Sequence, residues 1–301
     1  MTPENLLHYP FPSQKCTLGC PILDRCLNGG IPCNSITEIF AESGSGKTQL
    51  CLQLSLCAQL PVSLGGLSAS ALYFHTEFSF PFRRLHQLSH CFQSLYSQAV
   101  IDEANCSSNY NNYNPCDNIY VQSVHSADQL LDIMPKIESF LVNSKTHFPV
   151  RLIVIDSVAA LFRSEFDNTS SDLRRRSLLF FKISGKLKEL AKRFNLAVVV
   201  TNQVVDFVGS GEGVNGVRIG NLASLYSSGR RVCPALGLAW ASCVNSRLFL
   251  ARDENGMVDG DEGSSPCGQT KRRLHVVFAP HLPYSSCELV IKREGVFGVD
   301  R

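Results

Sequence analysis

Residues 41–48 carry the side-chain types and the spacing of a phosphate-binding loop. They read Ala-Glu-Ser-Gly-Ser-Gly-Lys-Thr, follow an apolar run at residues 36–40 and precede a helix-compatible run that begins at Gln49. Small residues allow successive backbone N–H groups to surround phosphate oxygens at a helix N-terminus, where the helix dipole favours an anion. A strand, a glycine-rich turn and a helix in this order predict a nucleotide-binding loop.

The residues of this loop have different expected parts in binding. Lys47 is expected to reach the β- and γ-phosphates, and Thr48 to hold Mg²⁺ through its hydroxyl. Ala41 replaces the glycine that usually opens the pattern, a difference of one methyl group. An ordinary glycine-rich turn is the alternative, but the flanking strand, the flanking helix and an acidic site downstream favour nucleotide binding. The expected cofactor-binding residues of the loop are Glu42, Ser43, Gly44, Ser45, Gly46, Lys47, Thr48 and Gln49.

Two carboxylates and one amide follow apolar runs that predict strands. Asp156 ends the run at residues 152–156, Glu77 follows the run at 71–76, and Gln203 follows the run at 196–201. The carboxyl ends of parallel strands meet at the edge of the sheet where ligands bind. Asp156 is therefore expected on the Mg²⁺ side, Glu77 as the base for an attacking water, and Gln203 as a sensor of the γ-phosphate.

Each of these three residues also has a structural interpretation. Asp156 is suited to cap the next helix, and Glu77 to lie as an acid before a helix predicted at residues 80–91. Gln203 is equally suited to hold a loop in place as a buried amide. The phosphate loop upstream favours the metal role of Asp156. The catalytic role of Glu77 is also favoured, and the expected catalytic residues are Glu77, Lys47 and Gln203.

Composition excludes some classes of protein and leaves others open. The chain has 301 residues, a formal net charge of +2 and 13 cysteines. The length favours one large domain, and the charge requires any DNA contact to come from local basic clusters. The absence of a secretory segment and of Cys-x-x-Cys pairs favours a reducing compartment over a disulfide scaffold. No apolar run approaches the roughly 20 residues that cross a bilayer, so no membrane association is expected.

Metal sites other than one for Mg²⁺ are not expected. Cys16, Cys20, Cys26 and Cys33 gather near the N-terminus, but their spacing fits no common zinc knuckle. Histidines and cysteines at residues 86–91 are better explained as surface or core groups.

The order of the predicted elements indicates an α/β fold. Five strand-like runs, most of them separated by helix-compatible stretches, predict a mostly parallel central sheet covered by helices. They lie at residues 36–40, 71–76, 118–122, 152–156 and 196–201. Short runs at residues 247–252, 274–278 and 289–292 predict a C-terminal antiparallel extension. Loops are expected at residues 105–117, 208–231 and 253–271, and the second of these is rich in glycine and arginine.

These motifs, in this order, resemble those of the RecA/RadA-type recombinases and their eukaryotic paralogues. The matching pieces begin near residue 16 and include residues 27–32, 37–39, 41–48, 76–77, 152–157 and 201–204. The resemblance implies a RecA-like P-loop ATPase core over residues 36–301, preceded by a short lead-in at residues 1–35 without a separate helical DNA-binding module. It also implies ATP and Mg²⁺ as cofactors.

The resemblance assigns roles to single residues. Glu77 matches the catalytic base, Asp156 the acid on the metal side, and Gln203 a switch between ATP and DNA. Arg84 matches an arginine that lies against adenine, and Pro283 a proline that reaches the nucleotide of a neighbouring subunit.

DNA contacts are expected in two segments, at about residues 163–176 and 205–231. The candidate DNA-binding residues are Arg163, Arg174, Arg175, Arg218, Arg230 and Arg231. A solvated helix face is the alternative explanation for the arginines at residues 174–176.

The implied function is mediation of homologous recombination repair of DNA double-strand breaks in the nucleus, with the cytoplasm as a second compartment. The implied partners are another recombinase paralogue, the main eukaryotic strand-exchange recombinase, and single-stranded or branched DNA. Three departures from the family pattern, Ala41, Phe78 and Phe278, predict slow hydrolysis, and the short lead-in lacks a Phe-x-x-Ala linker. A DNA-dependent ATPase with its own strand-exchange activity is the alternative, and a RecA-fold ATPase without a DNA role is a third possibility.

Overall fold

A computed structural model describes residues 14–103, 113–143, 148–163, 166, 169–207, 225–253 and 270–300. Most of the loops predicted at residues 105–117, 208–231 and 253–271 lies outside these residues, as does Arg218. All statements about the structure refer to the described residues.

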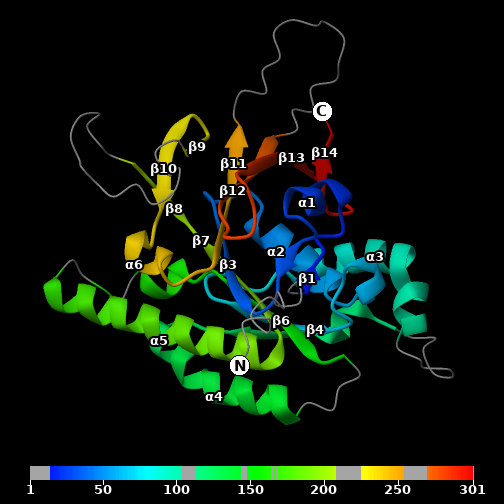
Figure 1. The fold of residues 1–301 in the computed structure, drawn as a ribbon, viewed down its shortest axis with the longest axis horizontal. Coiled ribbons are helices and arrows are strands. Elements are labelled where there is room, and N and C mark those ends of the chain that lie inside the picture. The colour runs from blue at the N-terminus through cyan, green and yellow to red at the C-terminus, as the bar shows by residue number, and fades with distance from the viewer. Residues whose placement is uncertain are drawn as a thin grey trace, which may run out of the picture.

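A nine-stranded sheet runs through the centre of the molecule in the order β14-β13-β12-β11-β3-β7-β6-β4-β5 (Figure 1). The strands are β3 (Ser35–Phe40), β4 (Ser70–His75), β5 (Ile119–Ser123), β6 (Val150–Asp156), β7 (Ala197–Asn202), β11 (Ser246–Asp253), β12 (Lys271–Phe278), β13 (Ser285–Ile291) and β14 (Val296–Val299). Every pair from β11 to β5 is parallel, and every pair from β11 to β14 is antiparallel. The predicted fold class, a parallel sheet with a C-terminal antiparallel extension, is confirmed.

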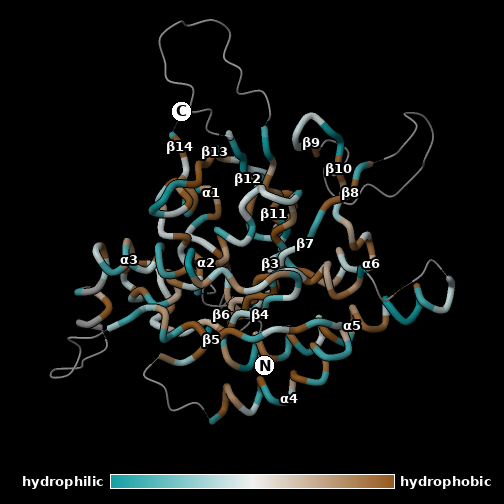
Figure 2. Tube along the Cα trace, turned by 180° about the vertical axis from the view of Figure 1, so that it is seen from behind, coloured by the Kyte–Doolittle hydropathy of each residue, from teal (hydrophilic) through white to brown (hydrophobic). Residues whose placement is uncertain are grey.

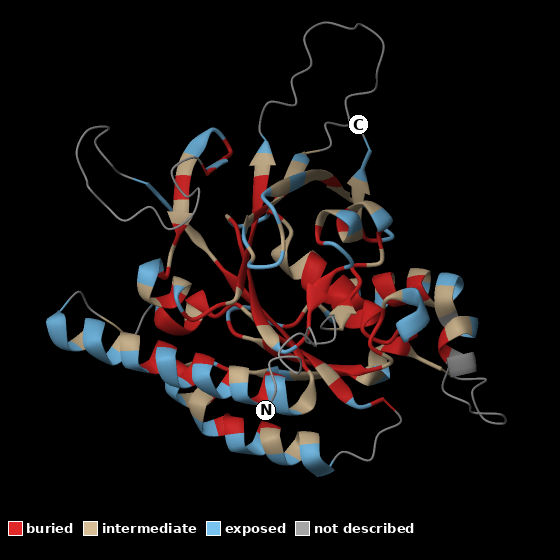
Figure 3. Ribbon diagram, in the orientation of Figure 1, coloured by how far each residue is buried: buried red, intermediate tan, exposed pale blue. Residues whose placement is uncertain are grey.

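The central strands are apolar because both faces of the sheet are covered. In β6, Leu152 and Val154 pack into one core, whereas Ile153 and Ile155 pack into the other. The residues of β7 alternate between the two cores in the same way. Figure 3 shows this buried centre between exposed helix surfaces.

Two groups of helices form these cores with the sheet. One core contains residues of α1 (Pro21–Cys26), α2 (Lys47–Cys57) and α3 (Phe82–Glu103). The other contains residues of α4 (Ala127–Asn143), α5 (Ser170–Phe194) and α6 (Gly237–Ala241). Hydrophobic and hydrophilic residues alternate along α4 and α5 (Figure 2), as expected for helices with one buried face. Short 3-10 helices lie at Val62–Leu64, Pro115–Asn118 and Ala159–Phe162.

Residues before β3 belong to the same core as α2. Strands β1 (Lys15–Cys16) and β2 (Ile31–Pro32) pair with each other, and α1 lies between them in the sequence. Cys16 and Cys33 are buried in this core, and burial raises the pKa of both thiols, that of Cys33 to about 11. These two cysteines are therefore neutral core side chains. Within the described ranges no group of three potential metal ligands gathers, and no helix is long and apolar enough to cross a membrane.

The last residues of the loop predicted at residues 208–231 belong to strands instead. Strands β9 (Tyr226–Ser227) and β10 (Arg230–Pro234) form a hairpin, and β10 also pairs with β8 (Val204–Asp206) in a small three-stranded sheet. The sequence of β9 and β10, with its glycine and arginines, does not have a pattern typical of strands. The partner of β10, β8, lies on the other side of the segment 208–224, so no local pattern predicts the pairing.

A buried ion pair connects β3 to β11 below the phosphate loop. Glu38 is fully buried, Arg247 is 3% exposed, and Arg247 Nε lies 2.6 Å from Glu38 Oε2. The other Glu38 oxygen accepts a 2.7 Å hydrogen bond from Asn202 Nδ2 in β7. Both carboxylate oxygens are thus occupied, and three neighbouring strands share one polar network.

We predict that Glu38→Ala lowers the free energy of unfolding by about 3–5 kcal/mol, because it leaves the Arg247 cation buried without a partner. Denaturant titration provides the measurement. Glu138→Ala, which breaks the exposed pair with Arg193, is the matched control, and its cost should stay below about 1 kcal/mol. Equal costs for the two variants would contradict this account of the buried pair.

A second prediction concerns Cys26. A hydrogen bond with Cys287 lowers the pKa of Cys26 to about 6, a second one with Ser285 acts in the same direction, and burial opposes both. Since the thiolate is the reactive form, alkylation of Cys26 by iodoacetamide should rise as pH increases through about 6. Burial raises the pKa of Cys233, so that thiol is the control and should react only at higher pH. Peptide mass spectrometry at a series of pH values from about 5 to about 9 measures the alkylation rates of Cys26 and Cys233. The same pH profile for both cysteines would contradict the prediction.

Candidate nucleotide-binding site

The phosphate loop joins the end of β3 to the start of α2, as predicted. Gly44 and Gly46 have φ angles of 75° and 110°, in the region that favours glycine. A Cβ atom at Gly46 would also lie 2.5 Å from Ile291 Cδ1 of β13, so the Ile291 side chain would have to move to admit a larger residue. Ser45 is fully buried, and its Oγ has no hydrogen-bond partner among the described atoms. The backbone therefore has the conformation that the glycine spacing requires, with a spare hydroxyl inside the loop.

The side chain of Lys47, the first residue of α2, folds back onto the start of the phosphate loop. Its Nζ donates 2.9 Å hydrogen bonds to the backbone oxygens of Ala41 and Glu42. Burial lowers the pKa of Lys47, although Asp156 and Glu77 oppose that shift by favouring its charged form. A cation in this position, with neutral carbonyl partners, suits an incoming phosphate group.

Asp156 is the centre of a hydroxyl network at the carboxyl end of β6. Its Oδ2 accepts 2.7 Å hydrogen bonds from Thr48 Oγ1 and Tyr73 OH, and its Oδ1 accepts one of 2.6 Å from Thr201 Oγ1. Burial and the neighbouring charge of Asp156 raise the pKa of Tyr73, so the phenol remains a donor. A carboxylate beside a threonine hydroxyl supplies the oxygen ligands that Mg²⁺ prefers. The donor set at Asp156 and Thr48 therefore fits the predicted metal.

Glu77, Gln203 and Arg163 form one polar cluster. Gln203 Nε2 donates a 2.8 Å hydrogen bond to Glu77 Oε1, and Arg163 Nη2 lies 3.0 Å from the same oxygen. Arg163 also donates to Gln203 Oε1. The predicted catalytic base, the predicted switch and a predicted DNA-binding residue thus contact one another.

These groups border a cleft of about 650 Å³. The residues that line it are Ser43, Gly44, Gly46, Lys47, Thr48, Gln49, Glu77, Phe78, Arg84, Asp156, Ser157, Gln203, Arg272, Ile291 and Lys292. Phe78, which stands where the family carries glycine, is 83% exposed at its rim. The volume and the mixture of cations, carboxylates and apolar groups suit a nucleotide.

Arg84 lies at the cleft but is held by protein groups. Its Nε donates to Gln49 Oε1 at 2.7 Å, and its two terminal nitrogens donate to the backbone oxygens of Arg293 and Lys292, each at 2.8 Å. Pro283 is exposed in the turn between β12 and β13 and does not line this cleft. The expected contacts of Arg84 with adenine and of Pro283 with a neighbouring subunit's nucleotide stay predictions.

The side chain of Glu42 turns away from the cleft toward the β9–β10 turn. It accepts hydrogen bonds from Ser227 Oγ (2.6 Å) and Ser228 Oγ, and it lies 3.2 Å from Arg230 Nη2. Burial alone would raise the pKa of Glu42, but these two hydrogen bonds and the charges of Arg252 and Arg230 lower it. Any contact of Glu42 with nucleotide must therefore come from its backbone.

The other predicted DNA-binding residues lie on two elements. Arg174 and Arg175 are exposed on α5, where Arg175 pairs with Asp128 at 2.7 Å. Arg230 and Arg231 belong to β10, with helix α6 between that strand and α5 in Figure 1. Arg230 also pairs with Asp206, and Arg231 lies over the ring of Phe207 at 4.3 Å. Arg218 lies outside the described residues.

Several residues of the site were not predicted. Tyr73 and Thr201 lie within strands that were recognised, so the rule that strand ends converge could have found both hydroxyls. Arg272, Ile291 and Lys292 reach the cleft from β12 and β13. Only the antiparallel pairing brings these strands to the loop, and no local pattern shows it.

Comparisons with known proteins agree with this geometry. The sequence matches the family Rad51 over residues 14–218. It is 61% identical to the DNA repair protein XRCC3 homolog of Arabidopsis thaliana, over 99% of this chain and 97% of that protein. It is 36% identical to the DNA repair protein XRCC3 of Mus musculus, over 97% of this chain and 77% of the mouse protein. The DNA repair protein rhp57 of Schizosaccharomyces pombe is 29% identical over 95% of this chain and 79% of its own length.

Residues 157–167, 234–241 and 279–287 alone already favour similarity to XRCC3 within the family, and the identities above confirm it. The resemblance to RecA-type recombinases and their eukaryotic paralogues is likewise confirmed. By its fold, its phosphate loop and the family match over residues 14–218, this chain belongs to the Rad51 family.

Proposed function

We propose that this chain is an ATP-binding recombinase paralogue that supports homologous recombination repair of DNA double-strand breaks. The observation that carries the proposal is the phosphate loop beside the Asp156 hydroxyl network, at a cleft of nucleotide size. The names of the relatives, which describe DNA repair proteins, support the biological role.

The proposed cofactors are ATP and Mg²⁺. The ammonium group of Lys47 would exchange its two carbonyl acceptors for phosphate oxygens, and the loop N–H groups would surround them. Thr48 and Asp156 would hold Mg²⁺, which neutralises phosphate charge when it is bound. Residues of α3 and β13 would close the opposite end of the cleft.

Hydrolysis is proposed to be slow in the absence of DNA. A general base accepts a proton from the attacking water, and the contacts of Glu77 Oε1 with Gln203 and with the cation of Arg163 make that oxygen a weaker acceptor. A DNA phosphate that attracts Arg163 would loosen this cluster. DNA binding and the catalytic base would then be connected through one guanidinium group.

The proposed partners are a second recombinase paralogue, the main strand-exchange recombinase and DNA, and the proposed compartment is the nucleus. The positions of the predicted DNA-binding arginines support the DNA contact, because Arg163, Arg174, Arg175 and Arg230 are exposed and Arg231 is partly exposed. Autonomous strand exchange is not favoured by the names of the relatives.

The first test separates nucleotide binding from hydrolysis. Lys47→Ala should weaken ATP binding by about tenfold or more, because charged hydrogen bonds to phosphate are lost, whereas Glu77→Gln should leave it nearly unchanged. Titration calorimetry with Mg²⁺ measures both. Lys186→Ala, on the exposed face of α5, is the control for loss of a lysine.

Repair assays in cells that lack the endogenous chain extend this test. If ATP binding is sufficient, Glu77→Gln restores repair and Lys47→Ala does not. Restoration by Lys47→Ala would contradict the proposal that bound ATP is required.

A further prediction concerns Arg163. Arg163→Ala should raise DNA-independent phosphate release severalfold and reduce its stimulation by single-stranded DNA, because Glu77 loses its cationic partner. Arg193→Ala, at the far end of α5, is the control and should change neither rate. An unchanged DNA-independent rate in Arg163→Ala would show that this ion pair does not restrain Glu77.

A further inference from the structure

Two arginines meet beside the phosphate loop on the side away from Asp156. Arg252 of β11 and Arg272 of β12 are register partners in the antiparallel pair of strands. Arg272 Nη2 lies 3.4 Å from the backbone oxygen of Gly44, and a Cβ atom built at Gly44 would lie 3.5 Å from Arg252 Nη1. Both guanidinium groups therefore converge on the middle of the loop.

Neither arginine has an acidic partner among the described residues. The other two arginines of these strands do, because Arg247 pairs with Glu38 and Arg273 with Glu288. The Nε atoms of Arg252 and Arg272 are buried without a hydrogen-bond partner in the described part of the chain. Buried donors are normally satisfied, so two unmatched ones at one place indicate a missing acceptor.

Glu42 does not supply that acceptor. The charge of Arg252 contributes to the lowered pKa of Glu42, but no ion pair joins them within the described ranges. The carboxylate is already engaged by Ser227, Ser228 and Arg230.

The two cations also disfavour each other. Burial and the charge of Arg252 lower the pKa of Arg272. Like charges directly opposite on paired strands are destabilising, and an anion between or beside them removes that cost. The arrangement is therefore more stable with an anion bound than without one.

The position of Arg272 indicates which anion. It lines the same cleft as Ser43, Gly44 and Lys47, so a group bound to the loop is within the reach of its side chain. Arginine is suited to phosphate because its planar donors match two oxygens at once.

We propose that Arg252 and Arg272 form a second cationic contact for the terminal phosphates of bound ATP, on the β11–β12 side of the loop. The inference rests on the proposed function, since it requires that the chain binds ATP. ATP carries one phosphate more than ADP, so this contact makes the cleft prefer the triphosphate.

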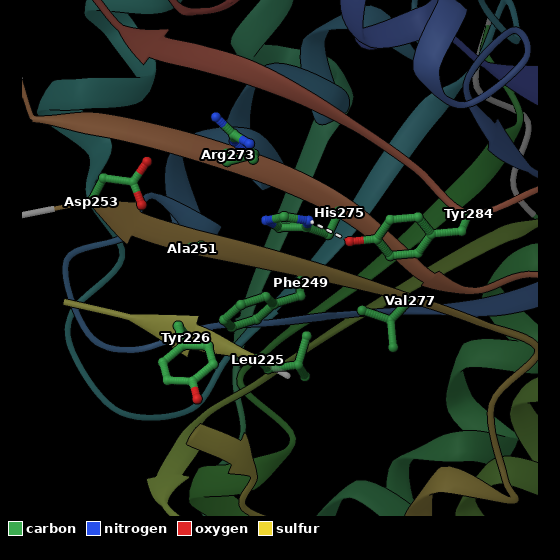
Figure 4. Close-up of a pocket in the computed structure, with 9 residues that line it drawn as sticks. All are labelled: Leu225, Tyr226, Phe249, Ala251, Asp253, Arg273, His275, Val277 and Tyr284. Carbon is green, nitrogen blue, oxygen red and sulfur yellow. Dashed lines mark hydrogen bonds between the residues drawn. The ribbon is translucent and has the colours of Figure 1, made fainter. Parts of the chain in front are cut away.

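Arg273 provides a matched control on the same strand. Neighbouring residues of a strand point to opposite faces, and Arg273 borders a different cavity, of about 260 Å³, between β9, β11 and β12. Figure 4 shows it near His275, whose Nδ1 lies 3.3 Å from Tyr284 OH. Removing Arg273 takes away the same charge at nearly the same place, but not at the phosphate loop.

The experiment compares the affinities of the full chain for ATP and ADP, with Mg²⁺, by titration calorimetry. Arg272→Ala should weaken ATP binding by about 10- to 100-fold, the loss expected for hydrogen bonds to a charged group, and ADP binding by clearly less. Arg252→Ala should change the ATP to ADP ratio in the same direction, and Arg272→Lys should restore part of it. Arg273→Ala should keep the wild-type ratio.

Three results would overturn the inference. If wild type binds ATP and Arg272→Ala keeps the wild-type ratio, the pair does not contact the terminal phosphates. If Arg273→Ala lowers the ratio equally, the effect is a general loss of positive charge. If wild type itself binds no ATP, the proposed function fails, and this inference with it. Melting curves of each variant without nucleotide show whether a loss of ATP affinity comes from misfolding. If Arg272→Ala is misfolded, Arg272→Lys, which keeps the charge, replaces it in the comparison of ATP and ADP affinities.

Discussion

The carboxylate of Asp156 is the interaction on which the site depends. It accepts hydrogen bonds from three hydroxyls on three elements, Thr48 of α2, Tyr73 of β4 and Thr201 of β7. Each hydroxyl fixes one neighbour of β6 relative to the loop, so the positions of the helix and of both adjacent strands are determined together. All three donors are neutral hydroxyls, so none of these contacts is an ion pair. The geometry of the phosphate end of the cleft therefore depends on this one carboxylate.

A second consequence concerns the groups around this carboxylate. On one side, Glu77, Gln203 and Arg163 contact one another, so one oxygen of the expected base is engaged. On the other, Arg252 and Arg272 lack acidic partners among the described residues. The site thus combines a satisfied region beside Asp156 with an unsatisfied cationic region beside Gly44.

The sequence predicted the parts of the fold that local patterns determine. The loop at residues 41–48 and the buried strand that ends at Asp156 carry signals within a short window, and both are present. The hairpin of β9 and β10 was interpreted as loop because its pairing partners, β8 among them, lie across the segment 208–224. The partners of Glu42 and Arg163 were also unpredictable, since these contacts depend on how separate loops pack at one edge of the sheet. Motifs therefore predict the role of a residue, whereas tertiary contacts determine which groups its charged side chain pairs with.

The hydrogen bonds of Lys47 to Ala41 and Glu42 have a thermodynamic consequence. They satisfy two of the three donors of the ammonium group within the loop itself. A ligand that binds the folded chain and not the unfolded one adds stability by mass action, about 2.7 kcal/mol when its free concentration is a hundred times Kd. The melting temperature of the chain therefore depends on the concentration of such a ligand in the solution as well as on the sequence. Two preparations with different residual nucleotide would differ in apparent stability without differing in a single residue.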